Sequence, residues 1–359
     1  MRSIVPMVSI IPVNINVESC TFVATKIHKM SALPTVAISV GDPNGVGAEI
    51  VLKSFGDKTL FEQCIPVVYA DFDFMQALQN HFGTKVPLQP LDNHPKKDVL
   101  YVKSVWENSP EIDFGKQSTA AGTAAFESLQ AAALAVQQKE ADALVTAPIH
   151  KAAIKSDAFP FAGHTHYLAS LWGGKALMIL AHQKLRVALL TDHIPLAKVA
   201  SRITPNLIQE KTLQLAHTLE NDFGYSLPKI ALLGLNPHAG DQGVIGSEDD
   251  RILKPAIEKL QKEGIDISGP FAADGFFGQK SYQNYTAVLS CYHDQGLVGF
   301  KTLAFGNGVN ITAGLPFVRT SPDHGTAFDI AGKGIANYHS FAAAIQMACN
   351  IWAARQKNN

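Results

Sequence analysis

The chain has 359 residues, of which 47% are hydrophobic, and its 30 basic and 31 acidic side chains give a formal net charge of -1. This composition suits about two globular domains, while the near-neutral charge argues against nucleic acid or an anionic membrane surface as a partner, and no apolar run approaches the ~20 residues that cross a bilayer. The four cysteines lack CxxC spacing, which argues against a disulfide framework or a thiolate metal site and indicates the reducing cytoplasm.

The first thirty residues differ from the rest. They are rich in apolar side chains, but Pro6, Pro12 and Asn14 interrupt every stretch that could serve as the core of a secretory signal. We therefore expect residues 1–33 to form a disordered or artefactual N-terminal extension, with Met30 as the true start, and a weak targeting segment is the alternative.

From Pro34 onward, short β-branched runs alternate with amphipathic stretches, a pattern typical of a parallel α/β sheet. The first run predicts a buried strand over Thr35–Val40, which ends at a glycine-rich loop, Gly41–Gly47, and leads into a helix through Leu52. Ser118 is the expected N-cap of a helix that reaches about Gln138. A further strand is predicted over Ala143–Thr146.

The second half of the chain does not follow the strictly alternating strand and helix pattern of the first half. Leu177–Ala181 and Leu185–Leu190 flank a short turn and predict a hairpin, so the sheet there is expected to be mixed. The remaining predicted elements are helix Pro205–Asn221, strand Lys229–Leu233, helix Ser247–Lys262 capped by its serine, strand Thr286–Ser290, and an alanine-rich helix Ser340–Arg355.

Three histidines follow predicted strands. They are His193, His238 and His293, and each lies in a loop that also carries Asp, Asn or Gln. Ligands of open α/β proteins bind at the carboxyl ends of strands, and three imidazoles would hold a divalent metal with positions open for substrate. A single histidine is more often a surface or core residue, but the shared context of these three predicts one metal site.

The glycine-rich loop Gly41–Gly47 is not a nucleotide fingerprint. It fails the GxGxxG pattern because Ile50 occupies the third glycine position, and the chain has no GxxxxGK[ST] sequence. Two interpretations stay open: a tight turn that only feeds a helix, or a helix N-terminus that meets an anion.

A second loop carries the strongest cofactor signal. The segment from His324 to Asn337 resembles the adenosine-binding loop of the isocitrate and isopropylmalate dehydrogenases. The resemblance implies that His324 and Asn337 contact adenine and that Asp329 faces the ribose. A carboxylate there would repel a 2'-phosphate, which favours NAD over NADP, with NADP as the alternative. The same resemblance implies cofactor contacts from Gly325, Thr326 and Ala327.

Five further motifs narrow the resemblance to one family. The strings GDPNGVGAEI at 41–50, TAPIHK at 146–151, GHT at 163–165, NPHAG at 236–240 and YHDQG at 292–296 together resemble the 4-hydroxythreonine-4-phosphate dehydrogenase family of vitamin B6 synthesis. The resemblance runs from about Pro34 to the C-terminal helix. It implies two α/β/α domains with mixed sheets and a deep cleft, as in isocitrate and isopropylmalate dehydrogenases. The expected division is 34–163 plus 315–359 for the cofactor domain and 164–314 for the metal-binding, dimer-forming domain.

The resemblance also implies roles for individual residues. His193, His238 and His293 match metal ligands, the last contributed across a dimer interface. Five residues match substrate contacts: His164, Thr165, Lys301, Asn310 and Arg319. Cations suit an anionic substrate because they donate charge-assisted hydrogen bonds. One departure is His166, where the family commonly has glutamate.

The function so implied is an NAD-dependent oxidation assisted by one divalent metal. A phosphorylated hydroxy amino acid, 4-(phosphooxy)-L-threonine, would become a 3-oxo acid that loses carbon dioxide to give 3-amino-2-oxopropyl phosphate. Asp274 and Asp294 are the candidate general bases, and either could instead orient a neighbour. Three imidazoles favour zinc, cobalt or nickel, although magnesium or manganese would accept the substrate's oxygens.

Three alternatives stay open at this stage. The first is a sister enzyme of the same fold that oxidises 4-phospho-threonate, a phosphoerythronate or a cis-dihydrodiol carboxylate. The second is a three-histidine metallohydrolase, against which the His324–Asn337 loop argues. The third is a metal-binding scaffold without activity. If His293 comes from a partner, the site needs a homodimer.

Overall fold

The computed structural model describes residues 33–92 and 95–358, and Leu33–Asn359 form one compact unit. The predicted N-terminal extension lies, apart from its last residue, outside the described residues. None of the helices in this described part is long and apolar enough to cross a membrane.

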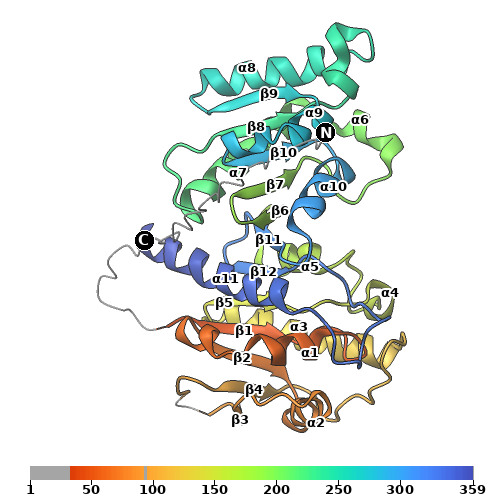
Figure 1. The fold of residues 1–359 in the computed structure, drawn as a ribbon, viewed down its shortest axis with the longest axis vertical. Helices are drawn as coiled ribbons and strands as arrows, with labels where there is room; N and C mark the ends of the chain where they lie inside the picture. Colours follow the sequence, from red (N-terminus) through yellow and green to blue (C-terminus); the bar gives the residue numbers. More distant parts are fainter. Residues whose placement is uncertain (1–32, 93–94, 359) are drawn as a thin grey trace, which may run out of the picture. The chain divides into compact units, whose positions relative to one another are not determined.

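The described residues form one twelve-stranded sheet with helices on both faces (Figure 1). In chain order the strands are β1 Thr35–Ser39, β2 Ile65–Ala70, β3 Leu88–Pro90, β4 Leu100–Ser104, β5 Ala143–Thr146, β6 Leu177–His182, β7 Leu185–Leu189, β8 Ile230–Leu233, β9 Ile267–Phe271, β10 Ala287–Ser290, β11 Val309–Ala313 and β12 Val318–Pro322. The α-helices are α1 Gly47–Ser54, α2 Phe72–Phe82, α3 Thr119–Gln137, α4 Lys151–Ile154, α5 His164–Trp172, α6 Val199–Arg202, α7 Pro205–Asn221, α8 Lys254–Lys262, α9 Ala273–Gly278, α10 His293–Ala304 and α11 His339–Asn358.

The sheet has a parallel section at each end and an antiparallel section between them. Its order is β3-β4-β2-β1-β5-β12-β11-β6-β7-β10-β8-β9. Pairs from β3 to β12 and from β7 to β9 are parallel, whereas β12/β11, β11/β6 and β6/β7 are antiparallel. The predicted α/β class and mixed sheet are therefore confirmed. The division into domains 34–163 plus 315–359 and 164–314 stays a prediction, because one continuous sheet joins both parts.

Side chains along each strand alternate between two apolar cores, as the pleat requires. In β1, Val36 and Ile38 pack into one core and Ala37 into the other. Helices α1, α2, α7, α8 and α11 cover the first face. Helix α5 and most of the buried side of α3 cover the second face at one end of the sheet, and α9 and α10 cover it at the other end.

Most predicted elements form where the pattern places them. Strand β5 and helix α7 have the predicted bounds, and β6 and β7 form the predicted antiparallel hairpin. Ser118 caps α3 as expected, since its side chain accepts a hydrogen bond from the backbone N–H of Ala121 at 3.0 Å.

The predicted serine cap at Ser247 is wrong. The helical segment begins with a π-helical turn at Asp249–Leu253 and continues as α8, with no side-chain cap. The buried Asp249 carboxylate instead accepts hydrogen bonds from the backbone N–H groups of Leu235 and Asn236, at 2.7 and 3.1 Å. Its side chain thus fastens the loop after β8, which explains why the helix start departs from the capping pattern.

Three neighbouring parallel strands deliver the three histidines. Strand β10 pairs with β7 on one side and β8 on the other, so their carboxyl ends lie along one edge. His193, His238 and His293 follow β7, β8 and β10 respectively. The prediction that all three follow strands is confirmed, and all three lie at this edge of the sheet.

Candidate functional site

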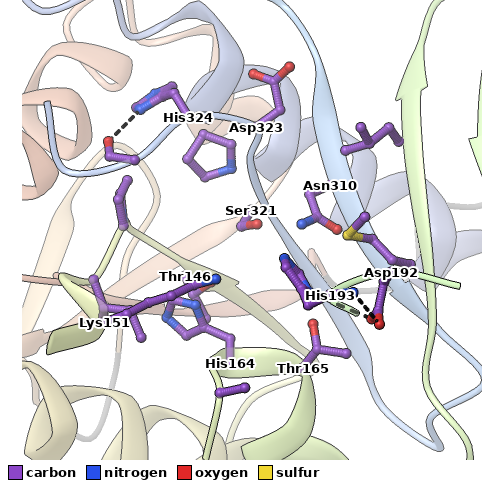
Figure 2. A pocket seen from close by; sticks show the side chains of 18 of the residues that line it. Thr146, Lys151, His164, Thr165, Asp192, His193, Asn310, Ser321, Asp323 and His324 are labelled. Atoms are coloured by element: carbon purple, nitrogen blue, oxygen red, sulfur yellow. Dashed lines mark hydrogen bonds and ion pairs between the residues drawn. The ribbon is translucent and has the colours of Figure 1, made fainter. Parts of the chain in front are cut away.

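A cavity of about 350 Å³ opens over the antiparallel section of the sheet. Figure 2 shows side chains from β5, β11, β12, α5 and the loop after β7 turned toward its centre. The cavity brings together nine residues that the sequence predicted for metal, substrate or cofactor: His164, Thr165, His193, His293, Lys301, Asn310, Arg319, His324 and Gly325. Motifs scattered over about 160 positions thus converge on one space.

Arg319 is the centre of the cavity's positive charge. It lies on β12, is 3% exposed, and donates hydrogen bonds to Thr312 at 2.9 Å and to Thr146 at 2.7 Å. Its Nε atom is buried without a partner, and no carboxylate of the described chain pairs with it. Burial lowers the pKa of Arg319 to about 9. A buried guanidinium held only by hydroxyls is costly, and a bound anion would relieve that cost.

Two neighbours also present unpartnered polar atoms. His164 Nε2 and Asn310 Oδ1 are buried and form no hydrogen bond with the described residues. Burial, followed by the nearby positive charges of Arg319 and Lys151, holds the pKa of His164 well below its usual range. His164 is therefore neutral at physiological pH. Unsatisfied buried groups around one cavity are the mark of a site built for a polar ligand.

His193 and His293 face each other across this cavity. Their ring centroids are 5.5 Å apart, which suits two imidazole ligands of one ion with metal–nitrogen bonds of about 2.0–2.1 Å. Each ring has a carboxylate beside its Nδ1: His193 lies 3.7 Å from Asp192, and His293 lies 2.7 Å from Asp294. Since Nδ1 of each ring contacts a carboxylate, Nε2 is the atom free to bind a metal. A carboxylate on Nδ1 also fixes the orientation of the ring and makes Nε2 more basic.

Asp192 is held in the ionised form that this arrangement needs. Its contact with the His193 side chain, together with the bond from the His193 backbone N–H and the nearby His166, keeps the pKa of the Asp192 carboxyl far below its usual range. Figure 2 shows the Asp192–His193 contact at the wall of the cavity. Asp192 is thus equipped to orient His193 and not to exchange protons near neutral pH.

His238 lies elsewhere. It lines a second cavity of about 480 Å³ together with Asp274 and Asp294. Within the described chain no group of three His, Cys, Asp or Glu side chains is arranged to hold a metal. The sequence expectation that His293 crosses a dimer interface stays a prediction, although His293 and His193 of one chain line the first cavity together.

The backbone around His238 is unusual. All five residues from His238 to Gln242 have left-handed φ values, between 43° and 80°. Such a run is unfavourable for residues with a Cβ and persists only where surrounding contacts enforce it. Within the run, the backbone N–H of Ala239 donates to the carbonyl of Asn236 at 3.0 Å and that of Ile245 donates to the carbonyl of Gly240 at 3.1 Å. The hydrogen bonds to buried Asp249 anchor only the segment that precedes the run. Backbone strain of this kind concentrates at functional loops.

The predicted cofactor loop links β12 to α11. Its first residues, His324 and Gly325, line the first cavity, and His324 Nε2 is buried without a partner. Asp329 and Asn337 are exposed, and Ala327 has a positive φ of 45°. Thr326, Ala327, Asp329 and Asn337 do not line the cavity. The loop therefore presents polar groups from the cavity's edge outward, as an extended ligand would require.

Several cavity residues were not predicted from the sequence. Lys151 lines the wall beside His164 and Thr146, and no carboxylate of the described chain pairs with it (Figure 2). Other polar residues of the wall are Thr146, His166, Asp192, Ser321 and Asp323. Lys151 belongs to the TAPIHK string and Asp192 precedes a predicted ligand, so both carried a signal in their motifs. Ser321 and Asp323 follow from β12 alone, which the sequence analysis did not predict.

An apolar surface adjoins the second cavity. On and after α10, Val298, Leu303 and Phe305 are 67%, 43% and 87% exposed, and Val244 of the His238 loop is 81% exposed. Val298 itself lines the second cavity. Large exposed apolar side chains gathered beside polar groups are typical of a protein interface.

Comparison with known protein families shows which family the chain belongs to. A model of the PdxA family, described as pyridoxal phosphate biosynthetic protein PdxA, matches residues 62–348. The chain belongs to this family. A 4-hydroxythreonine-4-phosphate dehydrogenase of Bacteroides thetaiotaomicron is 42% identical over 326 residues, covering 90% of each chain. One from Sulfurihydrogenibium sp. is 41% identical and covers 87% of this chain and 97% of its own.

Solved structures agree with this placement. A 4-hydroxythreonine-4-phosphate dehydrogenase from Klebsiella pneumoniae matches with a TM-score of 0.79 at 32% identity, covering 90% of this chain and 99% of that one. The one from Burkholderia phymatum has a TM-score of 0.74 at 34% identity, with coverage of 89% and 99%. A terephthalate 1,2-cis-dihydrodiol dehydrogenase from Burkholderia xenovorans is more distant, with a TM-score of 0.60, 25% identity and coverage of 89% and 98%.

Proposed function

We propose that this chain is a 4-hydroxythreonine-4-phosphate dehydrogenase of pyridoxal 5'-phosphate synthesis. It oxidises the secondary alcohol of 4-(phosphooxy)-L-threonine to 2-amino-3-oxo-4-(phosphooxy)butanoate, which loses carbon dioxide to give 3-amino-2-oxopropyl phosphate. Family membership and full-length relatives of about 40% identity support this assignment. The observation that carries it is buried Arg319, a cation in the cavity without a carboxylate partner in the described chain.

The charges of the cavity suit a substrate with two anionic ends. Arg319, Lys301 and Lys151 line it, and none of them pairs with a carboxylate of the described residues. A phosphate and a carboxylate on one small molecule would take up these charge-assisted donors. The unpartnered Oδ1 of Asn310 is an acceptor for the substrate's ammonium group.

The donors present also fit a divalent metal and a nicotinamide cofactor. His193 and His293 would hold the metal, and the loop from His324 to Asn337 would hold NAD, with NADP disfavoured by the Asp329 carboxylate. When bound, the metal lowers the pKa of the alcohol, and the nicotinamide takes its hydride. The chain's own part is to orient: Asp192 and Asp294 fix the two imidazoles, and neutral His164 can accept or donate a hydrogen bond at the substrate.

A homodimer would complete the site. We place His238 as the ligand that comes from the partner, because it lies beside the exposed apolar side chains of α10 and apart from the other two histidines. Asp274 lines the same cavity as His238, so it would arrive with it as the general base. Asp294 contacts His293 directly, which makes it an orienting residue in this proposal.

The described cysteines accord with a cytoplasmic enzyme. Cys64, Cys291 and Cys349 are buried free thiols. Such thiols persist in a reducing compartment, where disulfides are rare.

Sister activities are the second candidate. A dihydrodiol dehydrogenase shares the fold, and family membership favours the phosphorylated substrate over its cis-dihydrodiol carboxylate, because the three unpaired cations would suit either class of anion. They do not separate the phosphorylated hydroxy acids from one another. These substrates differ in the substituent on carbon 2, which is an ammonium in 4-(phosphooxy)-threonine and a hydroxyl in 4-phospho-threonate.

A spectrophotometric assay decides between these functions. Formation of NADH is followed with 4-(phosphooxy)-threonine and 4-phospho-threonate in parallel, with added divalent metal and again with chelator. We expect reduction with the first substrate that exceeds the second and is abolished by chelator. A preference for 4-phospho-threonate would establish the sister activity, and no reduction with either would contradict the proposal.

A further inference from the structure

Helix α1 contacts the predicted cofactor loop at two points far apart along that loop. At its start, the backbone N–H of Val46 donates to the carbonyl of Thr326 at 3.1 Å. A Cβ at Gly45 would lie 3.0 Å from the same carbonyl oxygen, so a larger residue would have to push the loop away by a few tenths of an ångström. The N–H that could have met an anion is therefore committed to the loop. Figure 1 shows the loop running down from β12 toward α1.

The second point is a shielded ion pair. Lys53 Nζ lies 2.7 Å from Glu49 Oε1, one turn away on the helix, and the Glu49 side chain is fully buried. Lys53 also donates to the carbonyls of Gly334 and Ala336, at 2.8 and 3.2 Å. The backbone N–H of Ala336 donates back to Glu49 Oε1 at 2.8 Å. One carboxylate and one ammonium thus bind three backbone groups of the loop's far end.

The loop itself has little regular structure to hold it. Between β12 and α11 the described residues form turns only, and Ala327 takes a left-handed conformation. A segment of this kind loses conformational entropy when it becomes ordered on a ligand, which lowers affinity unless the protein orders it beforehand. The contacts from Gly45 to Lys53 supply that order.

We propose that the segment Gly45–Lys53 is a dock that pre-forms the loop His324–Asn337 for the nicotinamide cofactor. Glu49 and Lys53 are positioning residues in this proposal, because neither lines the two cavities and both act through Ala336. The dock gives the glycine-rich string at 41–50 a role in cofactor affinity. The inference rests on the proposed function for the identity of the loop's ligand, and not for the dock itself.

Hydrogen exchange tests the dock directly, on the full chain without cofactor. The variants are K53M, which removes the ammonium, K53R, which keeps a cation, and G45A, which crowds Thr326 at the other end. The matched control is K103M, which breaks the 3.0 Å Lys103–Glu140 ion pair, whose side chains are 41% and 51% exposed. We expect amides of 324–337 to exchange about tenfold faster in K53M and G45A, less so in K53R, and unchanged in K103M.

Steady-state kinetics provide the second readout. We expect K53M to raise the KM for NAD by about tenfold, corresponding to a loss of pre-organisation, with kcat and the KM for the phosphorylated substrate within about twofold of wild type. Loop exchange that stays at the wild-type rate in K53M, or that rises equally throughout the chain, would overturn the dock. Faster loop exchange with an unchanged KM for NAD would uphold the dock and overturn the assignment of the loop to the cofactor.

Discussion

The two cavities at the carboxyl edge of the sheet differ in how complete they are. The first gathers Arg319, Lys301 and a pair of neighbouring histidines from three different parts of the chain, and its unsatisfied polar atoms point to a polar ligand. The second gathers His238 and Asp274 next to exposed apolar side chains. The difference indicates that the first cavity of one chain holds two of the three candidate histidine ligands. The second cavity holds the third histidine, His238, together with Asp274. In the proposed homodimer, a second copy of the chain would supply what each cavity lacks.

The largest expected effect comes from separating the two copies. V298D places a charge on the exposed apolar surface beside the second cavity, 67% exposed in one chain. We expect the dimer to dissociate and activity in the first cavity to fall by about 10³-fold, because the metal loses one ligand and the base. Sedimentation velocity and the NADH assay measure this. A monomer with full activity would show that the first cavity is self-sufficient.

The next effect removes the cation at the centre of the first cavity. R319M is expected to raise the KM for the phosphorylated substrate by about 100-fold, because charge-assisted hydrogen bonds to the anion are lost. Its Tm without ligand should equal or exceed that of wild type, since the buried guanidinium has no carboxylate partner in the described chain. Calorimetry and kinetics check both parts. A large fall in Tm would indicate a structural role for Arg319.

A smaller effect is expected from the carboxylates that orient the histidines. D294N replaces the carboxylate that contacts His293 Nδ1 with a neutral amide. We expect metal binding to weaken by about 10- to 100-fold. D274N, in the second cavity, should leave metal affinity close to wild type and lower kcat, with the pH profile of kcat altered. Competition with a metal indicator gives the affinities. Equal losses of metal affinity in both variants would contradict the separate roles.

The smallest effect concerns stability and pH. The pKa of His164 is lowered in the folded chain, so below its unfolded value of about 6.5 the unfolded chain binds a proton that the folded chain does not. His164 therefore costs stability as pH falls from 7 to 5. H164Q should lose less unfolding free energy over this range than wild type, by up to about 1.4 kcal/mol per pH unit. Urea unfolding at several pH values measures the slopes, and parallel slopes would refute a neutral His164.

The sequence predicted the parts of the fold that have local signals. Ser118 with the following apolar spacing predicted α3, and the predicted bounds of α7 match the structure, where Pro205 occupies the first helical turn. Strand β12 was not predicted, because its polar Arg319, Thr320 and Ser321 are buried by partners distant in sequence and look like loop residues when read alone. The predicted cap at Ser247 was wrong for a similar reason. The nearby Asp249 carboxylate accepts a hydrogen bond from Leu235 in the loop after β8, a contact that is distant in sequence.

The site followed the same rule. His164 lies in one of the motifs, whereas Lys301 and Arg319 were implied only by the family resemblance, and the structure brings all three into one cavity. Which chain each histidine serves could not be read from spacing, because His193, His238 and His293 follow strands that are adjacent in the sheet. Only the placement of His238 in a second cavity separates it from the other two.

Heterodimers of inactive variants test the shared site most directly. Chains carrying H193A and H238A, co-expressed with different tags and purified as a mixed dimer, should regain about half of wild-type activity, because one of the two sites keeps all three histidines. A mixed dimer of H193A and H293A should stay inactive, since both residues serve the same chain's cavity. An inactive first pair, or an active second pair, would contradict a site completed by the partner's His238.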